Sequence, residues 1–326
     1  MSESSRPKIV LTDRFADYPA AALEALAASG IAFADANAAG DDPMERIRDA
    51  EVLMVLGYRV TAEVIRQLRR CKVIIRLGVG YDIIDAEAAQ ELGIAVCNVP
   101  DYCMAEVADH AMALALAQIR ALPFLDRCVR QGVWKSQLPY PMPTCAEMNF
   151  GVLGYGRIGR ATGARARGFG FHLLACDPYL PDADFPPDVR RCTLEELLAE
   201  ADLLSLHVPL TAETRHILNA ERLALMKPTS ILINTARGAV VETEALVEAL
   251  RTGRIAAAGL DVFEEEPLPL DHSLLSCPNA LVAPHFAWHS RESRARLYQL
   301  AVEEAIRGVR GEPLRSCVNG VQPNRT

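Results

Sequence analysis

The residues most able to do chemistry are an arginine, a glutamate and a histidine that follow successive apolar runs in the second half of the chain. They are Arg237 in INTARGAVV, Glu266 in GLDVFEEEP and His285 in LVAPHFAWHS. An arginine can grip a carboxylate and polarise a carbonyl group, and a histidine can donate a proton near neutral pH. A carboxylate beside that histidine would hold its ring and favour its protonated form. The set therefore suits hydride transfer to the ketone of an organic acid.

Each of these residues also has a purely structural explanation. Arg237 could be a solvated turn residue, Glu266 a charge in an acidic loop, and His285 a capping or core histidine. Because the carboxyl ends of parallel strands converge on one crevice, we expect the three to lie together. We expect the other histidines, apart from His207, to be structural or exposed: His110, His172, His216, His272 and His289.

A glycine-rich turn could hold the cofactor that such a reaction needs. The apolar strand expected at 149–153 runs into Gly154, Gly156 and Gly159, in GxGxxG spacing, and then into a segment of helical composition. The first glycine permits a tight turn, the second lets the backbone approach a pyrophosphate, and the third lets helix pack on strand. The helix N-terminus would bind the phosphates. The spacing also occurs in ordinary glycine-rich turns, so a second signal is needed.

That second signal is an acidic residue after the next expected strand. Eighteen residues beyond Gly159, the apolar run 171–176 ends in Asp177. An acid at this position binds the ribose hydroxyls of NAD and repels the extra phosphate of NADP. No arginine follows in 178–180, so the sequence favours NAD. The alternative is a turn residue before Pro178.

Two further strand ends could complete the cofactor pocket. His207 ends LLSLH and is a candidate for lining it. Asp261 could meet the carboxamide side of the nicotinamide, or could cap its own strand. In the first half, RLGVGYD at 76–82 is a glycine-rich turn whose free backbone N–H groups could hold a carboxylate.

The elements that position these residues alternate between strand and helix, which predicts a parallel α/β architecture. A long helix should follow Pro100, and its small apolar face suits packing between domains or subunits. Another should run from Arg291 towards the C-terminal CVNG. The remaining helices are expected at 20–28, 43–49, 61–68 and 85–92. The strands are expected at 8–12, 52–56, 73–76, 94–97, 149–153, 171–176, 202–207, 230–234, 256–260 and 280–283.

Bulk composition limits the classes of protein that this chain can represent. Its 326 residues suffice for two domains with their own cores. A net charge of −8 argues against nucleic acid or an anionic membrane as a partner. Nine cysteines without a CxxC pair, after the polar start MSESSRPK, predict reduced thiols in a cytoplasmic protein with no metal site.

Several motifs resemble one enzyme family over nearly the whole chain. VLGYGRIGR, SLHVPLTAETRHILN, LINTARGAVVETEALVEAL and AAGLDVFEEEP are similar to the NAD-dependent D-2-hydroxyacid dehydrogenases. RLGVGYD, AVCNVP, VADHA, HFAWHS and CVNG resemble the C-terminal-binding-protein branch of that family. The resemblance implies a doubly wound Rossmann NAD-binding domain at 101–290. It also implies a smaller flavodoxin-like substrate domain, discontinuous in sequence, at 1–100 and 291–326, and a homodimer.

The resemblance also implies roles for particular residues. Arg237, Glu266 and His285 would be catalytic. The substrate would be bound by Arg76, Gly78, Val79, Gly80, Tyr81 and Trp288. NAD(H) would be bound by Gly154, Gly156, Arg157, Ile158, Gly159, Asp177, His207, Val208, Pro209, Thr214, Thr235, Ala236, Arg237, Asp261, His285 and Trp288.

Two functional interpretations remain open from the sequence. In the first, the chain is an enzyme that reduces a 2-oxo acid to the D-hydroxy acid, with closure of the two domains excluding water. In the second, it is an NADH-sensing module of the corepressor type with little turnover. The short stretch after CVNG favours the enzyme. Trp288 and Tyr81 would suit a medium apolar or aromatic side chain, while glyoxylate and hydroxypyruvate remain possible substrates.

Overall fold

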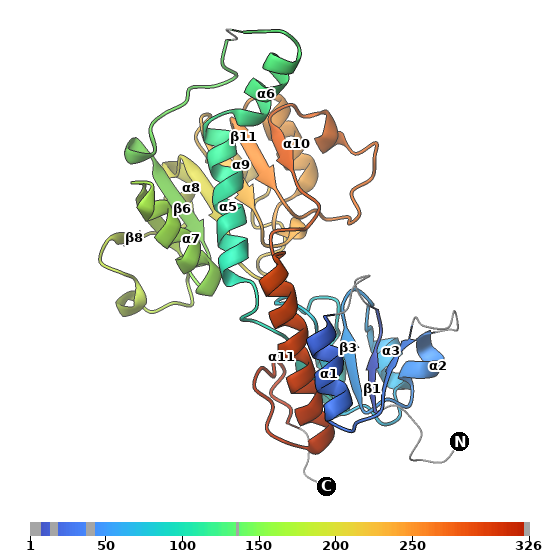
Figure 1. Cartoon of the computed structure of the whole chain (residues 1–326). Helices are drawn as coiled ribbons and strands as arrows, with labels where there is room; N and C mark the ends of the chain where they lie inside the picture. The colour runs from blue at the N-terminus through green and yellow to red at the C-terminus, as the bar shows by residue number, and fades with distance from the viewer. Residues whose placement is uncertain (1–7, 14–18, 37–42, 135–136, 323–326) are drawn as a thin grey trace. The chain divides into compact units, whose positions relative to one another are not determined.

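The computed structural model describes residues 8–13, 19–36, 43–134 and 137–322, and these divide into two compact units. The first unit contains 1–103 and 290–326, and the second contains 104–289. The first unit therefore takes its chain from both ends of the sequence, and the second is continuous. Each unit is built on its own parallel sheet (Figure 1).

The sheet of the first unit has five parallel strands in the order β2-β1-β3-β4-β5. This is the flavodoxin-like order, in which the chain reverses direction across the sheet after β2. Strands β1 and β3 are completely buried because helices cover both faces of the sheet. The strands are β1 Ile9–Leu11, β2 Phe33–Asp35, β3 Val52–Val55, β4 Val73–Arg76 and β5 Ala95–Cys97.

Helices α1 and α11 lie on one side of this sheet and α2 and α3 on the other (Figure 1). Helix α11 packs on the sheet so closely that a Cβ on Gly308 would lie 2.9 Å from a methyl carbon of Val73. After α11 the chain runs beside β5, where Cys317 pairs with Cys97 in antiparallel fashion. The helices are α1 Ala20–Ala28, α2 Pro43–Ile47, α3 Ala62–Gln67, α4 Ala86–Glu91 and α11 Arg291–Arg310.

The second unit has seven parallel strands in the order β12-β11-β10-β9-β6-β7-β8. The first strand in sequence, β6, lies between β7 and β9, so the order reverses beside it and leaves a crevice at the carboxyl ends. The strands are β6 Asn149–Leu153, β7 His172–Cys176, β8 Val189–Arg191, β9 Leu203–Leu206, β10 Ile231–Asn234, β11 Ala257–Leu260 and β12 Ala280–Val282.

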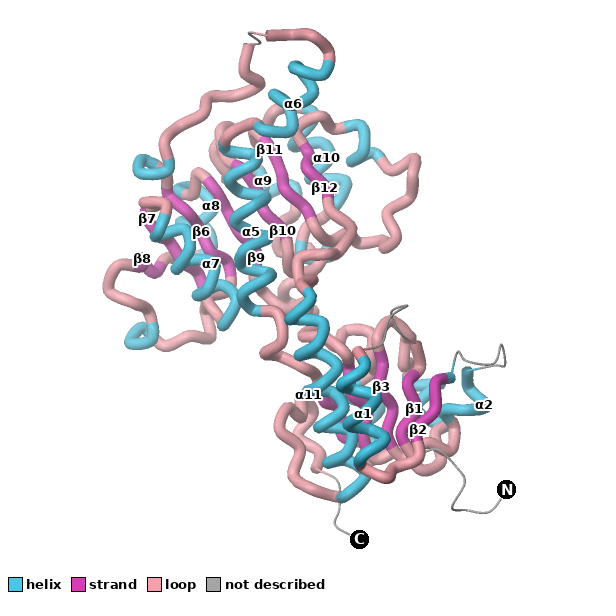
Figure 2. Tube along the Cα trace, viewed as in Figure 1, coloured by secondary structure: helices cyan, strands magenta, loops and turns pink. Residues whose placement is uncertain are grey.

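Helices lie on both faces of this second sheet and form two apolar cores (Figure 2). Helices α5 and α7 pack together on one face, and α8, α9 and α10 lie on the other. This is the doubly wound Rossmann architecture that the sequence predicts, and the prediction is confirmed. The helices are α5 Met104–Ile119, α6 Leu122–Arg130, α7 Arg157–Gly168, α8 Leu194–Glu200, α9 Ala220–Leu223 and α10 Thr243–Arg251.

Strands β2 and β8 and helix α6 were not expected from the sequence, and each has little buried surface. No range was expected for α8, α9 or α10 either, although these helices contribute buried residues to the core. Strand β2 is only half-buried at the sheet edge, and β8 buries Val189 alone. Helix α6 has no buried residue and carries Pro123 in its first turn. Helix α5 also differs from expectation, because its buried face packs against α7, β10 and β11 within the second unit. Within the described residues, no helix is both long and apolar enough to cross a bilayer.

Candidate active site

The GxGxxG turn joins β6 to α7, and a different structural feature accounts for each of its three glycines. Gly154 has φ +88, and a Cβ there would lie 2.8 Å from the carbonyl of His207. A Cβ on Gly159 would lie 2.1 Å from the carbonyl oxygen of Gly154, so helix and strand could not pack. A Cβ on Gly156 would meet nothing within 4 Å. The middle glycine therefore borders open space at the N-terminus of α7, where a pyrophosphate would bind.

Asp177 follows β7 and braces this turn. One of its carboxylate oxygens accepts a hydrogen bond of 2.9 Å from the backbone N–H of Tyr155, inside the glycine motif. The other accepts one of 3.1 Å from the N–H of Tyr179. A carboxylate has about four acceptor positions, so two remain for the hydroxyls of a ribose. Tyr179 is itself hydrogen-bonded through its hydroxyl to Glu213.

His207 lies at the end of β9, against the glycine turn. Its backbone N–H donates to the carbonyl of Leu153 at 2.7 Å, and its Nε2 lies 2.9 Å from the hydroxyl of Ser205. Burial lowers the pKa of His207 to about 4, so the ring is neutral at physiological pH. A neutral ring places no positive charge beside the cofactor crevice.

Glu266 and His285 form a close pair although 19 residues separate them. The Nδ1 atom of His285 lies 2.6 Å from Oε2 of Glu266, and Oε1 of Glu266 accepts a hydrogen bond of 2.9 Å from the N–H of Phe263. Burial raises the pKa of Glu266, but the pairing with His285, the Phe263 N–H and the charge of Arg237 together bring it below its usual value. The carboxylate therefore stays ionised beside the imidazole.

The backbone of His285 is held in a conformation that only a well-braced loop tolerates. Its φ is +54, a region that costs a residue with a side chain about 1–3 kcal/mol. Fully buried Asp261 braces it, since the two carboxylate oxygens accept 2.8 Å hydrogen bonds from the N–H groups of Phe286 and Ala287. The carbonyl of Asp261 accepts from the N–H of His285 at 2.7 Å. Nε2 of His110 lies 3.5 Å from the same carboxylate.

Arg237 lies three residues beyond the end of β10. Its carbonyl accepts a 2.8 Å hydrogen bond from the side-chain amide of Asn234, and its Nη1 donates to the carbonyl of Ala236 at 2.7 Å. The next residue, Gly238, cannot carry a side chain, because a Cβ would lie 1.9 Å from the backbone of Phe263. The loop that carries Arg237 thus packs directly on the loop that carries Glu266.

The other cofactor residues expected in this unit surround the same strand ends. The hydroxyl of Thr235 is buried and, among the described residues, has no hydrogen-bond partner, which leaves it for a ligand. The hydroxyl of Thr214 donates to the carbonyl of Pro209 at 2.6 Å. The indole N–H of Trp288 donates to the carbonyl of His285 at 3.1 Å. Arg157 and Ile158 begin α7, Val208 follows His207, and Ala236 precedes Arg237.

In the first unit, the turn after β4 presents backbone donors beside a cation. Gly78 has φ +157, and a Cβ there would lie 2.8 Å from Nη1 of Arg76, so the guanidinium folds over the glycine. The side-chain amide of Asn98 donates to the carbonyl of Val79 at 2.6 Å and fixes the turn. Among the described residues, no acceptor binds the N–H groups of Val79 or Gly80. Tyr81 follows and is 39% exposed.

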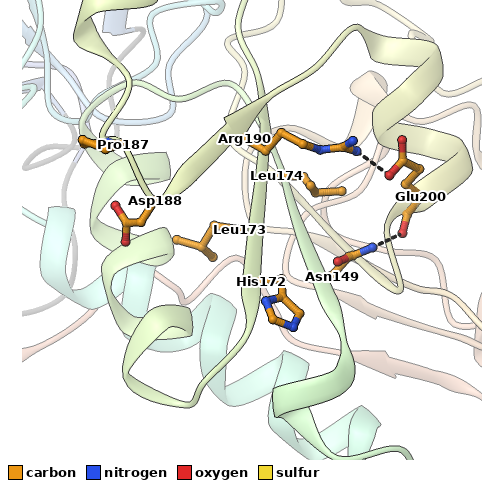
Figure 3. A pocket seen from close by; sticks show the side chains of 8 residues that line it. All are labelled: Asn149, His172, Leu173, Leu174, Pro187, Asp188, Arg190 and Glu200. Atoms are coloured by element: carbon orange, nitrogen blue, oxygen red, sulfur yellow. Dashed lines mark hydrogen bonds and ion pairs between the residues drawn. The ribbon is translucent and has the colours of Figure 1, made fainter.

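A pocket of about 550 Å³ lies elsewhere in the second unit, at the starts of the strands (Figure 3). Asn149 and His172 begin β6 and β7, and the amide of Asn149 donates to the carbonyl of Glu200 at 3.0 Å. Arg190 pairs with the carboxylate of Glu200. The predicted residues lie at the opposite ends of the strands or in the loops and the helix that follow them, so this pocket is not the candidate active site.

Several residues that position the site were not expected from the sequence. Asn234 holds the loop of Arg237, and Asn98 holds the turn after β4. His110 and His216 were expected to be structural or exposed, yet they contact the site through Asp261 and Glu264. His216 lies in TAETRHILN, one of the motifs that carry the family resemblance, and that was the available signal.

The fold and this arrangement together define a class of protein. A doubly wound parallel sheet holds a glycine turn with an acid after the second strand, and a His–Glu pair and an arginine lie on loops at the same edge. That combination is typical of a dinucleotide-dependent oxidoreductase.

Comparison with known proteins identifies the family. Residues 112–287 match the D-isomer specific 2-hydroxyacid dehydrogenase, NAD binding domain. A glyoxylate reductase from Korarchaeum cryptofilum is 42% identical over 283 residues, which cover 85% of each chain. The D-lactate dehydrogenase of Aquifex aeolicus, solved with NAD and lactic acid, gives a TM-score of 0.84 at 30% identity, covering 93% of this chain and 96% of its own.

A second solved structure differs in its cofactor. The NADPH-dependent glyoxylate/hydroxypyruvate reductase of Sinorhizobium meliloti, in complex with NADP and malonate, gives a TM-score of 0.85 at 30% identity, covering 99% of this chain and all of its own. This chain belongs to the D-isomer specific 2-hydroxyacid dehydrogenase family. It is an oxidoreductase that uses NAD(H) and interconverts 2-oxo acids and D-2-hydroxy acids.

Proposed function

We propose that this protein reduces small 2-oxo acids, such as glyoxylate and hydroxypyruvate, with Arg237, Glu266 and His285 as its catalytic residues. The observation that carries the assignment of roles is the 2.6 Å pair between Nδ1 of His285 and Oε2 of Glu266, with the charge of Arg237 acting on the same carboxylate. This group lies on loops of the NAD-binding domain. The proposed substrate class is supported by the activities for which the related reductases are named.

The geometry of the pair suggests a role for each ring nitrogen of His285 and for the carboxylate of Glu266. Because Nδ1 of His285 is engaged by Glu266, its Nε2 is left to give a proton to the oxygen of the substrate. The ionised Glu266 stabilises the imidazolium that carries this proton. Arg237 would bind the carboxylate of the substrate and polarise its ketone. When bound, NADH supplies the hydride for the carbonyl carbon.

The residues present fit this cofactor. The open space at Gly156 admits a pyrophosphate at the N-terminus of α7, and the unpartnered hydroxyl of Thr235 offers a polar contact. Asp177 keeps acceptor positions for the ribose and would repel the phosphate of NADPH. We therefore propose NADH rather than NADPH, in contrast to the Sinorhizobium relative. Of the other expected contacts, His207 would line the crevice as a neutral ring.

In the first unit, the substrate carboxylate would bind the turn after β4. The N–H groups of Val79 and Gly80 are available as donors, and Arg76 lies over Gly78. Tyr81 and Trp288 would contact the rest of the substrate. With this assignment, 1–100 and 291–326 form the substrate domain and 101–290 the NAD-binding domain.

The experiment that tests the proposal follows consumption of NADH and NADPH with a panel of 2-oxo acids from glyoxylate to phenylpyruvate. We expect rapid turnover of glyoxylate or hydroxypyruvate with NADH, and a much lower rate with NADPH. The His285→Gln variant should lose turnover by about 10²-fold or more, because it lacks the proton donor, while NADH binding changes little.

His272→Gln is the matched control, since this histidine instead caps the short turn Ser273–Ser276. Unchanged turnover in His285→Gln would overturn the catalytic assignment. Fast turnover of only large or aromatic 2-oxo acids would overturn the substrate class. Tight NADH binding with trace turnover of every acid would favour the corepressor-type sensing module, which the names of the related reductases do not favour.

We further propose a homodimer, supported by helix α6, which has no buried residue and exposes Leu122 and Val129. Membership of the C-terminal-binding-protein-like branch rests on the sequence motifs alone. The cytoplasmic location and the lack of nucleic-acid and membrane partners stay predictions from composition.

A further inference from the structure

The loops that carry Arg237 and Glu266 have a second connection beyond their direct contact, and it passes through His216. The backbone N–H of His216 donates a 2.8 Å hydrogen bond to the carbonyl of Ala239, two residues after Arg237. Its Nε2 lies 2.5 Å from Oε1 of Glu264, two residues before Glu266. One residue outside both loops therefore holds each of them close to its functional side chain.

The backbone conformation of His216 indicates that its surroundings hold this residue in place. Its φ is +51, one of three positive values among the described non-glycine residues, and His285 has another. A residue with a side chain adopts this region at a cost of about 1–3 kcal/mol and keeps it only where its surroundings fix it. Here the surroundings are the segment after Arg237, because Leu218 also donates to the carbonyl of Val240 at 3.2 Å.

The side-chain contact of His216 acts on a loop with few other restraints. Glu264 lies in the acidic run 264–266, and all three residues of this run are exposed. Phe263 is fixed by Gly238 on one side, and Glu266 is fixed by Phe263 and His285 on the other. The bond from His216 restrains the part of the loop that lies between these two anchors.

We propose that His216 is a positioning residue for the reaction: through Ala239 and Glu264 it fixes the separation between the substrate-binding Arg237 and the Glu266–His285 pair. The proposal rests on the catalytic roles proposed above for those three residues. A displacement of about 1 Å between reacting groups can lower a rate by about 10²-fold, so a residue outside the site can control turnover in this way.

The first test compares His216→Asn and Glu264→Ala with the wild type. Asparagine tolerates a positive φ but is too short to reach Glu264, so the backbone is kept while the side-chain bond is lost. Each variant should lose about tenfold in kcat/KM for glyoxylate, with unchanged melting temperature and NADH affinity. Glu265→Ala, which removes the neighbouring exposed carboxylate, is the matched control and should keep wild-type kinetics.

The second test is a double-mutant cycle between His216→Asn and Glu266→Gln. If His216 acts by placing Glu266, its loss should have little further effect once Glu266 is replaced, so the two effects should not add. Fully additive effects would show that His216 supports the fold alone and would overturn the proposal. Wild-type kcat/KM in both His216→Asn and Glu264→Ala would also overturn it, provided that Glu266→Gln lowers turnover. If Glu266→Gln retains full turnover, the proposed function itself has failed.

Discussion

At the scale of single residues, the site depends on groups whose charge is fixed by their surroundings. Glu266 is kept ionised by His285, a backbone N–H and Arg237, against the opposing effect of burial. His207 is kept neutral by burial. A carboxylate and a neutral imidazole thus lie on different loops of one crevice, and only the first is placed to stabilise a proton on His285. Their different surroundings separate a catalytic pair from a residue that lines the cofactor crevice.

The depressed pKa of His207 predicts a loss of stability in acid. The folded form has a pKa of about 4, against an ordinary value of 6.5, so the unfolded chain binds the proton more readily between these values. The contribution is therefore fully present above pH 6.5 and is lost as the pH falls towards 4. From the size of the shift it amounts to at most about 3 kcal/mol. His207→Gln should remove this part of the pH dependence.

Urea unfolding of the cofactor-free protein at pH 7 and pH 5 measures this effect. Both tryptophans, Trp134 and Trp288, lie in the second unit, so their fluorescence follows the unit that contains His207. His172→Gln, which replaces an exposed histidine at the start of β7, is the control and should keep the wild-type pH dependence. An identical loss of stability in wild type and His207→Gln would contradict the prediction.

Some of these residue contacts could be predicted from the sequence and others could not. The expectation that Glu266 and His285 would meet follows from parallel strands converging at one edge, and the structure brings them together. The contact of His216 with Glu264 joins residues 48 apart, and it depends on how closely the loop at Gly238 approaches Phe263. Sequence spacing carries no information about such an approach between two loops.

At the scale of elements, the buried strands were predictable from their apolar runs, and the glycine turn was predictable because the acid at Asp177 gave a second signal. The short edge strands β2 and β8 were not, since each is held by a neighbour on one side and buries few apolar side chains. Helix α6 was missed for a related reason, because none of its residues is buried within the chain. These three elements depend little on the core for their formation.

A substitution in the β6–α7 turn should weaken cofactor binding without affecting folding. Gly156→Ala should fold normally, because the φ of Gly156 is −74 and its Cβ would meet nothing within 4 Å. It should weaken NADH binding by tenfold or more, because the methyl group would occupy the space that the pyrophosphate needs. Titration of NADH against tryptophan fluorescence, together with a thermal melt, gives both quantities.

Two other glycines of the same helix serve as controls. Gly168→Ala also adds a Cβ that meets nothing within 4 Å, but at the far end of α7, so NADH affinity should not change. Gly159→Ala should destabilise the second unit strongly, because its Cβ would overlap the carbonyl of Gly154. Wild-type NADH affinity in Gly156→Ala would show that the cofactor does not approach this glycine.

At the scale of the whole molecule, the proposed homodimer would cover apolar side chains that are exposed on α6 and in the residues after it. Val129 is 57% exposed and Trp134 is 79% exposed, in a protein whose net charge of −8 otherwise suits solvent. Exposed apolar side chains that gather in one patch suit an interaction surface. A second copy of the chain is the partner that the proposed homodimer supplies.

The homodimer predicts that a charge on α6 will separate the subunits. Val129→Asp would bury a carboxylate in the interface without disturbing the core of its own chain, because no residue of α6 is buried there. Light scattering after gel filtration should give the wild type twice the chain mass of 35.6 kDa, and the variant a single chain mass at low micromolar concentration. Leu225→Asp, at a comparably exposed apolar position outside α6, should remain a dimer. A monomeric wild type would contradict the proposed homodimer. A variant that stays dimeric would show that α6 does not form its interface.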